Sequence, residues 1–286
     1  MCNAFSGSVR LQLGQWTAEI LPGFGMNVIS LRENGKPVLR EPKDFETLEN
    51  SPYLHGIPLL FPANRTEGGR FVFGGNTYTL PLNEPLRNNH IHGLMYNAPF
   101  TVTEKTASSV TAEYINTSER YPFPFIMTVK DSLSESGFER ILTLRNTGGG
   151  SMPYTLAFHT AFVSPEKFSA PIERRFLVNE FFIPTGETRP LTPEETAYRS
   201  GASCEDRKIS GFFTSCGNTV RLDGIVFTVS DNFDEWILFN AGGGQGFFCA
   251  EPQAGKVNGL NTENGHKLLM PGEEAEYRLF IGKEHA

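Results

Sequence analysis

Two ionisable side chains stand in segments whose other residues are mostly apolar: His159 in YTLAFHTAF and Glu251 in GFFCAEPQ. Such segments are typical of buried strands, and burial moves the pKa of an acid or a base away from its value in water. A histidine and a carboxylate brought together from distant segments could give and take protons near neutral pH. These two residues are therefore our candidates for a general acid and a general base.

The neighbours of His159 define the space around it. In an extended run over residues 153–163, alternate side chains point to opposite sides. The large residues would pack in the core, and the small residues Ala157 and Ala161 would share a face with His159. Small neighbours leave room for a ligand beside the imidazole. A structural histidine bonded to the backbone explains the same segment equally well.

Glu251 follows the apolar run 247–250 and precedes Pro252. We expect it at the end of a buried strand, where its carboxylate must be paired or used because an isolated buried charge is costly. A rigid strand end that opens on a cleft suits a catalytic base. The alternative is an ordinary carboxylate bonded to the amides of a turn.

Other polar residues could hold a ligand. Asn64 and Arg65 follow the apolar segment LLFP. A guanidinium can bind a hydroxyl, a carboxylate or a phosphate, although an ion pair with Glu67 is the simpler interpretation. His90 and His92 form an H-x-H pair that would share one face of a strand and could bind a metal. The glutamate that double-stranded β-barrel metal sites of the cupin kind add a few residues later is missing, so we predict no metal.

The composition argues against several classes of protein. The net charge of −7 argues against nucleic-acid binding. The chain has no P-loop, no GxSxG motif and no GxGxxG motif after a predicted strand. Its four cysteines show no C-x-x-C spacing, no stretch approaches about 18 apolar residues, and the first residues lack a secretory signal. We therefore expect reduced thiols in a cytoplasmic protein with no cofactor and no membrane partner.

Strand patterns separated by turns occupy nearly the whole chain. Hairpin turns are predicted at Asn34-Gly35, Gly74-Gly75 and 135–137, and later strands at 220–222, 225–230, 236–240, 246–250 and 277–282. Only 45–48 and 192–198 favour helix, the second with Thr192 as its cap. The composition does not shift along the chain. We predict one all-β domain over residues 1–286, a sandwich of large antiparallel sheets.

Several short motifs occur in a fixed order between positions 56 and 273. They are GIPLLFPANR at 56–65, NNHIHG at 88–93, FHTAF at 158–162, EPQ at 251–253 with Asn261, and LMPGE at 269–273. In this order the chain resembles the aldose 1-epimerase (galactose mutarotase-like) family, in its compact bacterial branch. The resemblance implies a β-supersandwich fold and the interconversion of the α and β anomers of a hexose.

The resemblance also implies roles for single residues. His159 looks like the general acid near the ring oxygen, and Glu251 looks like the base that takes the proton of the C1 hydroxyl. The residues that look like substrate-binding groups are Asn64, Arg65, His92 and, as a weak counterpart of the family's aspartate, Asp206. No metal, nucleotide or covalent intermediate is needed, and we expect a monomer or a weak homodimer.

Three alternatives remain open. A hexose 6-phosphate 1-epimerase would need further cations, for which Arg70 and Arg87 are available. A non-catalytic carbohydrate-binding protein would need neither proton-transfer group, and a metal-dependent sugar isomerase would use the H-x-H pair.

The mechanism makes a geometric prediction. His159 and Glu251 should face each other across one cleft, several ångströms apart, with room for the edge of a sugar between them. Arg65 and His92 should line the same cleft, because all four side chains must reach one small ring.

Overall fold

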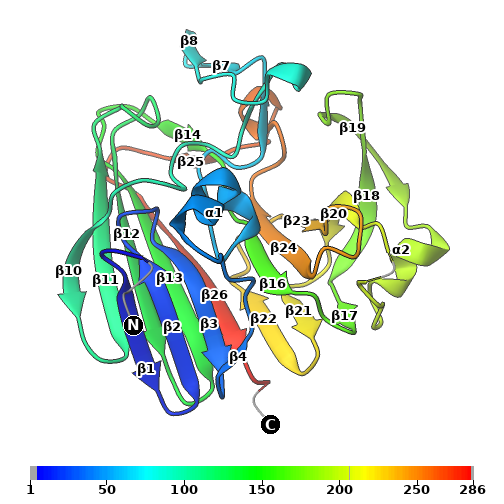
Figure 1. Ribbon diagram of the computed structural model, residues 1–286. Helices are drawn as coiled ribbons and strands as arrows, with labels where there is room; N and C mark the ends of the chain where they lie inside the picture. The colour runs from blue at the N-terminus through cyan, green and yellow to red at the C-terminus, as the bar shows by residue number, and fades with distance from the viewer. Residues whose placement is uncertain (1–4, 206, 285–286) are drawn as a thin grey trace.

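The computed structural model describes residues 5–205 and 207–284, and strands run through most of this part of the chain (Figure 1). The sequence explains why. In β12 (Phe125–Leu133), which reads FIMTVKDSL, every second side chain is buried. This period places one face of a strand against a core. The pairings within the two large sheets are antiparallel, which confirms the predicted all-β class.

The first large sheet has eight strands and packs against a sheet of four. Its order is β10 (Thr101–Lys105), β11 (Ser109–Asn116), β12, β13 (Gly137–Asn146), β26 (Glu274–Gly282), β22 (Ile225–Val229), β21 (Thr219–Leu222) and β17 (Phe168–Ser169). The four-stranded sheet contains, in order, β1 (Val9–Leu13), β2 (Trp16–Leu21), β3 (Asn27–Glu33) and β4 (Lys36–Pro37). In Figure 1 the blue strands of the smaller sheet lie beside β12 and β13.

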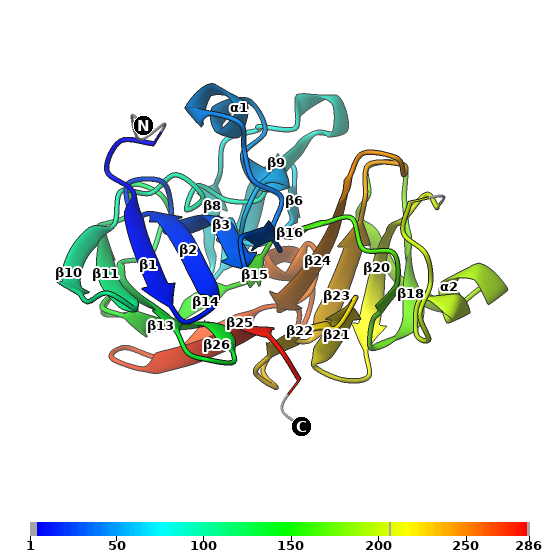
Figure 2. The same ribbon diagram turned by 60° about the horizontal axis from the view of Figure 1, so that its bottom comes forward.

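The second large sheet carries the residues of chemical interest. Its order is β19 (Pro184–Pro190), β18 (Ile172–Val178), β20 (Ser210–Ser215), β23 (Glu235–Phe239), β24 (Phe247–Ala254), β15 (Leu156–Phe158) and β5 (Leu59–Leu60), and β16 (Thr160–Val163) also pairs with β24. Figure 2 shows β18, β20, β23 and β24 on the opposite side of the molecule from β1 and β2. One hydrophobic cluster joins the sheets, since it contains Trp16, Val129, Phe158 and Leu238.

The remaining elements are short. Three two-stranded sheets pair β14 (Met152–Tyr154) with β25 (Lys267–Leu269), β6 (Arg65–Glu67) with β9 (Asn89–Ile91), and β7 (Arg70–Phe73) with β8 (Asn76–Thr79). The helical segments are α1 (Phe45–Asn50), α2 (Pro193–Ala197) and the 3₁₀ turns Pro52–Leu54, Pro85–Arg87 and Gly259–Asn261. Within the described residues, no helix is long and apolar enough to span a bilayer.

The predicted local elements agree with the structure, apart from two strands. The three hairpin turns join β3 to β4, β7 to β8 and β12 to β13, and Thr192 caps α2 with a capping box. The run 153–163 is divided into β14, β15 and β16 rather than forming one strand. The strand predicted to end at residue 250 continues through Pro252, which lies opposite Trp236, to Ala254. Glu251 therefore lies inside a strand and not at its end.

Candidate active site

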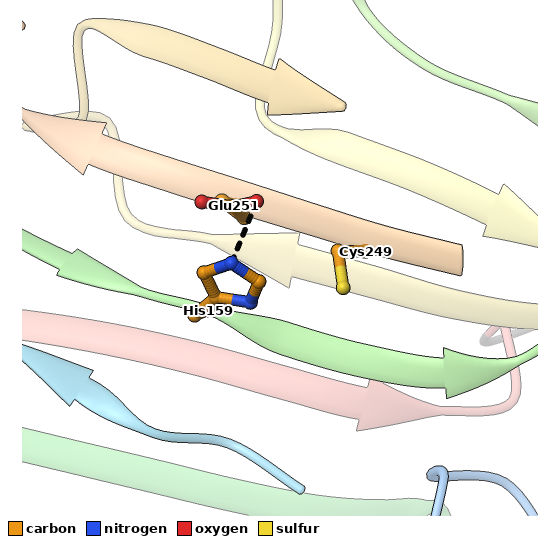
Figure 3. A group of neighbouring side chains, drawn as sticks. All are labelled: His159, Cys249 and Glu251. Carbon is orange, nitrogen blue, oxygen red and sulfur yellow. Dashed lines mark ion pairs between the residues drawn. The ribbon is translucent and has the colours of Figure 1, made fainter. Parts of the chain in front are cut away.

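His159 and Glu251 form a cross-strand pair on the second large sheet. β15 and β16 pair with β24 in one register, with Ala157 opposite Gln253 and Thr160 opposite Ala250. The same register places His159, between β15 and β16, opposite Glu251. The Nε2 atom of His159 lies 3.2 Å from Oε1 of Glu251 (Figure 3). The sheet thus brings together two side chains that are far apart in the sequence.

Burial sets the protonation of this pair. The exposed fractions of His159 and Glu251 are 4% and 2%. Burial raises the pKa of Glu251 to about 8, against the opposing charge of Arg65. Burial lowers the pKa of His159 to about 4. Between these two pH values the pair holds one dissociable proton, and at rest both groups are neutral, with the proton on the carboxyl group.

A cavity of about 590 Å³ opens over the pair, and its lining also includes Arg65 and His92. The structure thus brings four of the predicted site residues to one cavity. The expected separation of several ångströms is wrong, because the two side chains are in contact. A ligand must therefore sit over the pair, where each of two oxygens on one carbon could meet one of the two groups.

His92 stands beside His159 at the cavity wall. Its ring centroid is 5.3 Å from that of His159 and 4.5 Å from that of Tyr53. The backbone of His92 has a φ of 65° and its N–H donates to the carbonyl of Asn64 at 2.8 Å. Burial, with the charges of His159 and Arg65, holds the pKa of His92 well below its usual value. Its buried Nδ1 atom has no hydrogen-bond partner among the described residues.

Arg65 enters the cavity from the start of β6, held by a carboxylate that the sequence did not suggest. Its Nε and Nη2 atoms donate to the two oxygens of Glu84, each at 2.8 Å, rather than to Glu67. Burial opposes ionisation of Glu84, but hydrogen bonds from Arg65, Asn89 and Arg87 lower its pKa to about 2. This bidentate contact fixes the guanidinium plane at the cavity wall.

Asn64 lies behind Arg65 and is not part of the cavity lining. It is buried, with a φ of 54°, and its Oδ1 atom is 3.5 Å from Nη1 of Arg65. Its carbonyl also holds the backbone of His92. Asn64 is thus placed to support two lining residues. Asp206, the other predicted binding residue, lies outside the described residues.

The cavity wall also contains aromatic residues that the sequence did not single out. Tyr53, from the 3₁₀ turn Pro52–Leu54, approaches His159 with a centroid distance of 6.3 Å. Phe182 places its ring 5.1 Å from the guanidinium carbon of Arg65 and 4.6 Å from that of Arg87. No strand pattern or motif marks either residue.

Metal-binding side chains meet at one place within residues 5–205 and 207–284. The ligand atoms of His159, Cys249 and Glu251 all lie within 4.8 Å of one another, and zinc accepts all three ligand types (Figure 3). Burial raises the pKa of the Cys249 thiol well above its usual value, so an ion would have to displace protons from both Cys249 and Glu251. His90 instead places Nδ1 2.7 Å from the carbonyl of Pro81 and belongs to no such group.

The structure separates the two arginines considered for an anionic substrate. Arg87 lines the cavity, whereas Arg70, on β7, does not.

Arg65 gives a test of the cavity. We expect Arg65→Ala to lower kcat/KM for the hexose that the resemblance implies as substrate by about 10- to 100-fold, since a hydrogen bond to a charged group is worth about 1.5–3 kcal/mol. Arg70→Ala is the matched control and should stay at the wild-type value. Equal effects of the two substitutions in a steady-state assay would remove Arg65 from the site.

The chain is similar to several known proteins. A family model described as aldose 1-epimerase matches residues 8–280. The uncharacterized protein YihR of Escherichia coli K12 is 30% identical over 146 residues, which cover 48% of this chain and 47% of YihR. The alignment therefore spans about half of that relative.

Solved structures show the same fold. A galactose mutarotase-like protein from Clostridium acetobutylicum is 26% identical, with a TM-score of 0.91 over 98% of this chain and 95% of that chain. Galactose 1-epimerase from Lactobacillus acidophilus NCFM is 15% identical, with a TM-score of 0.78 over 97% of this chain and 94% of that chain. The fold is therefore the galactose mutarotase-like arrangement of antiparallel sheets that the sequence motifs implied.

Proposed function

Since the chain belongs to the aldose 1-epimerase family, we propose that it interconverts the α and β anomers of a hexose, with Glu251 as base and His159 as acid. The observation that carries this proposal is the contact between the two side chains at the floor of one cavity. The anomeric hydroxyl and the ring oxygen share one carbon, so two groups 3.2 Å apart can serve both oxygens at once.

The reaction begins with a proton shift inside the pair. The resting carboxyl group of Glu251 passes its proton to Nε2 of His159, which leaves a carboxylate and an imidazolium. The carboxylate then takes the proton of the C1 hydroxyl while the imidazolium protonates the ring oxygen. The bond between C1 and the ring oxygen breaks, and C1 becomes an aldehyde.

Ring closure reverses these transfers. Rotation about the bond between C1 and C2 turns the other face of the aldehyde toward the ring hydroxyl. That hydroxyl returns its proton to His159 and attacks C1, while Glu251 protonates the carbonyl oxygen. The pair holds the same number of protons before and after the cycle, so no proton has to come from solvent. Arg65 and His92 hold the sugar hydroxyls during the rotation.

A direct assay tests the proposal. Freshly dissolved α-glucose and α-galactose should reach anomeric equilibrium faster with the purified protein than without it, followed by polarimetry or proton NMR. Saturable acceleration supports an enzyme. Sugar binding without acceleration would instead favour a non-catalytic carbohydrate-binding protein and would overturn the proposal.

A second candidate substrate is a hexose 6-phosphate, and a specific arrangement favours it. Arg65 and Arg87 share the single carboxylate of Glu84, so this part of the cavity keeps one uncompensated positive charge. A phosphate could bind there through the guanidinium groups. Glucose and glucose 6-phosphate compared at equal concentration decide between the two substrates, because a phosphosugar enzyme should have a lower KM for the phosphorylated sugar.

The mechanism assigns no step to a metal, and this makes a prediction. Activity should be unchanged after dialysis against EDTA, since Glu251 and His159 exchange protons with the substrate directly. Loss of activity that zinc or another divalent ion restores would contradict the assignment and would favour a metal-dependent sugar isomerase using the group formed by His159, Cys249 and Glu251.

Core packing and free thiols support proposals for the domain organisation and the location of the enzyme. One hydrophobic cluster with residues from all three larger sheets supports one domain for the whole chain. Cys204, Cys216 and Cys249 are free thiols, which favours a cytoplasmic location. The proposed partner is a small sugar, without nucleic acid or membrane, and the proposed state is a monomer or a weak homodimer.

A further inference from the structure

Cys249 stands beside His159 and Glu251, and the proposed mechanism gives it no role. It is a free, fully buried thiol, and it is not part of the cavity lining. Its sulfur and the ligand atoms of His159 and Glu251 all lie within 4.8 Å of one another. A thiol, an imidazole and a carboxyl group at these distances are three side chains that can hold one zinc ion.

The strand pairing explains why these three side chains meet. Cys249 and Glu251 are two residues apart on β24, so their side chains point to the same face of the sheet. His159 lies opposite Glu251 on the neighbouring strand, and the same register places Ala161 opposite Cys249 (Figure 3). Ladder hydrogen bonds therefore hold the three ligands in place before any ion arrives, and the small side chain of Ala161 fills little of the space beside the sulfur.

The surroundings leave one side of this group open. Leu54 and Phe239 pack with Cys249 in an apolar cluster and also belong to the cavity wall. They cover the sulfur, whereas His159 and Glu251 open on the cavity. An ion could therefore enter through the cavity, and three protein ligands would leave its fourth position facing the cavity.

Charge balance and ligand type favour zinc over Mg²⁺ and Ca²⁺. Zinc would replace the protons of the Cys249 thiol and the Glu251 carboxyl group, and these two protons would pass to the solvent. A divalent ion with a thiolate, a carboxylate and a neutral imidazole has no net charge, so no uncompensated charge would be buried. Mg²⁺ and Ca²⁺ prefer oxygen ligands and would leave the thiol unused.

We propose that His159, Cys249 and Glu251 form a zinc site, and that zinc bound there inhibits the proposed enzyme. A carboxylate bound to zinc is a much weaker base, and an imidazole bound to zinc cannot accept a further proton. Both steps of the proposed mechanism would therefore stop. Zinc is an inhibitory ligand in this proposal and not a cofactor. The inhibition rests on the proposed anomerisation, whereas the binding of zinc does not.

The experiment starts from metal-free protein and compares two variants with the wild type. Cys249→Ala removes the thiol ligand alone. In the matched control Cys2, Cys204 and Cys216 are all replaced by alanine, so that Cys249 is the only thiol of the chain. Each protein is dialysed against EDTA and then against a buffer that binds no metal, and it receives Zn²⁺ or, as the control ion, Mg²⁺. Isothermal titration calorimetry gives the affinity, and polarimetry of α-glucose or α-galactose gives the rate.

Wild-type protein and the single-thiol control should each bind one zinc ion with a dissociation constant of about 1 µM or lower. At a free zinc concentration about ten times this constant, the rate should fall about tenfold, and EDTA should restore it. Mg²⁺ should change neither protein. Cys249→Ala should bind zinc at least about 10- to 100-fold more weakly, since even the loss of an outer-shell partner has that effect. Its rate, relative to its own zinc-free rate, should therefore resist the same zinc concentration.

Cobalt gives a second measurement that does not depend on activity. Co²⁺ occupies the same kind of site as zinc, and its bond to a thiolate absorbs in the near ultraviolet. This absorption band should appear in the wild type and in the single-thiol control and should be missing from Cys249→Ala. Either variant tests the site alone, so the experiment stays decisive if a thermal melt shows that one of them does not fold.

The outcomes separate the zinc site from the proposed function. Zinc binding that Cys249→Ala leaves unchanged, or a single-thiol control without the cobalt band, would overturn the site. Zinc binding at Cys249 with an unchanged or increased rate would overturn the inhibition. If no sugar is anomerised even without zinc, the proposed function fails, and calorimetry with the cobalt band still decides whether the zinc site exists.

Discussion

Glu251→Gln protein is expected to fold normally and to lose about 10²- to 10⁴-fold in kcat, the usual contribution of one general base. The amide keeps the shape of the protonated carboxyl group but cannot take the proton of the C1 hydroxyl. Folding should not suffer, because burial already holds the pKa of Glu251 at about 8. Polarimetry gives the rate, and a thermal melt shows whether the protein is folded.

The raised pKa of Glu251 also determines how pH changes the stability of the folded protein. Between the ordinary carboxyl pKa and about 8, the folded protein binds a proton at Glu251 that the unfolded chain has lost. The contribution of Glu251 to the free energy of unfolding therefore falls as pH rises through that window, and this contribution is reduced at pH 7. Glutamine does not titrate, so the Tm of Glu251→Gln at pH 7 should not be below that of the wild type on this account.

Glu235 provides a matched control for this prediction. It lies on the neighbouring strand β23, burial raises its pKa to about 8, and it does not line the cavity. Glu235→Gln removes an equally buried carboxyl group and should keep the wild-type rate. A Glu251→Gln protein with near wild-type activity would show that Glu251 is not the base. Equal losses in both variants would indicate a structural effect instead.

Activity is also expected to show a plateau between about pH 4 and about pH 8, with a loss of about tenfold per pH unit beyond each limit. Above the upper value Glu251 is ionised and His159 is neutral, so the pair has no proton for the ring oxygen. Below the lower value both groups carry a proton, so no base remains. The limits belong to the pair as a coupled unit.

The measurement is kcat/KM for the hexose against pH, corrected at each pH for the spontaneous reaction. Two pH units above the upper limit, kcat/KM should be about 100-fold below its plateau value. A rate that keeps rising above pH 8 would contradict the assignment of Glu251, because a simple base works better once it is fully ionised.

Among the residues that line the cavity, the sequence predicted those in apolar segments and missed several that loops supply. The flanking residues marked His159 and Glu251 as buried, and strand alternation could also have indicated Cys249, which is two residues before Glu251 on the same strand. The position of Glu251 within β24 was missed because Pro252 usually marks the end of a strand. Here the strand continues through the proline.

The partners of Arg65 could not be predicted from local sequence. Glu67 is two residues from Arg65 in the sequence, but Glu84 contacts the guanidinium instead. Glu84 forms a β-bridge with Asn89, the first residue of β9, and β9 pairs with the strand that contains Arg65. Phe182 comes from the loop between β18 and β19, and only long-range packing brings it to Arg65. Contacts of this kind depend on where loops lie relative to a sheet, and no periodic pattern in the sequence predicts them.

The pair formed by His159 and Glu251 belongs to a paired sheet, whereas the walls around it come largely from loops: Arg87 from one connection, Phe182 from another and Tyr53 from a third. Ladder hydrogen bonds fix the pair, and exchanging a loop does not disturb them. For the proposed epimerase, sugar preference could therefore change by loop replacement while the reaction stays the same. For protein engineering, the segments 80–88 and 179–183 are the places to change ligand recognition while the pair at the cavity floor stays unchanged.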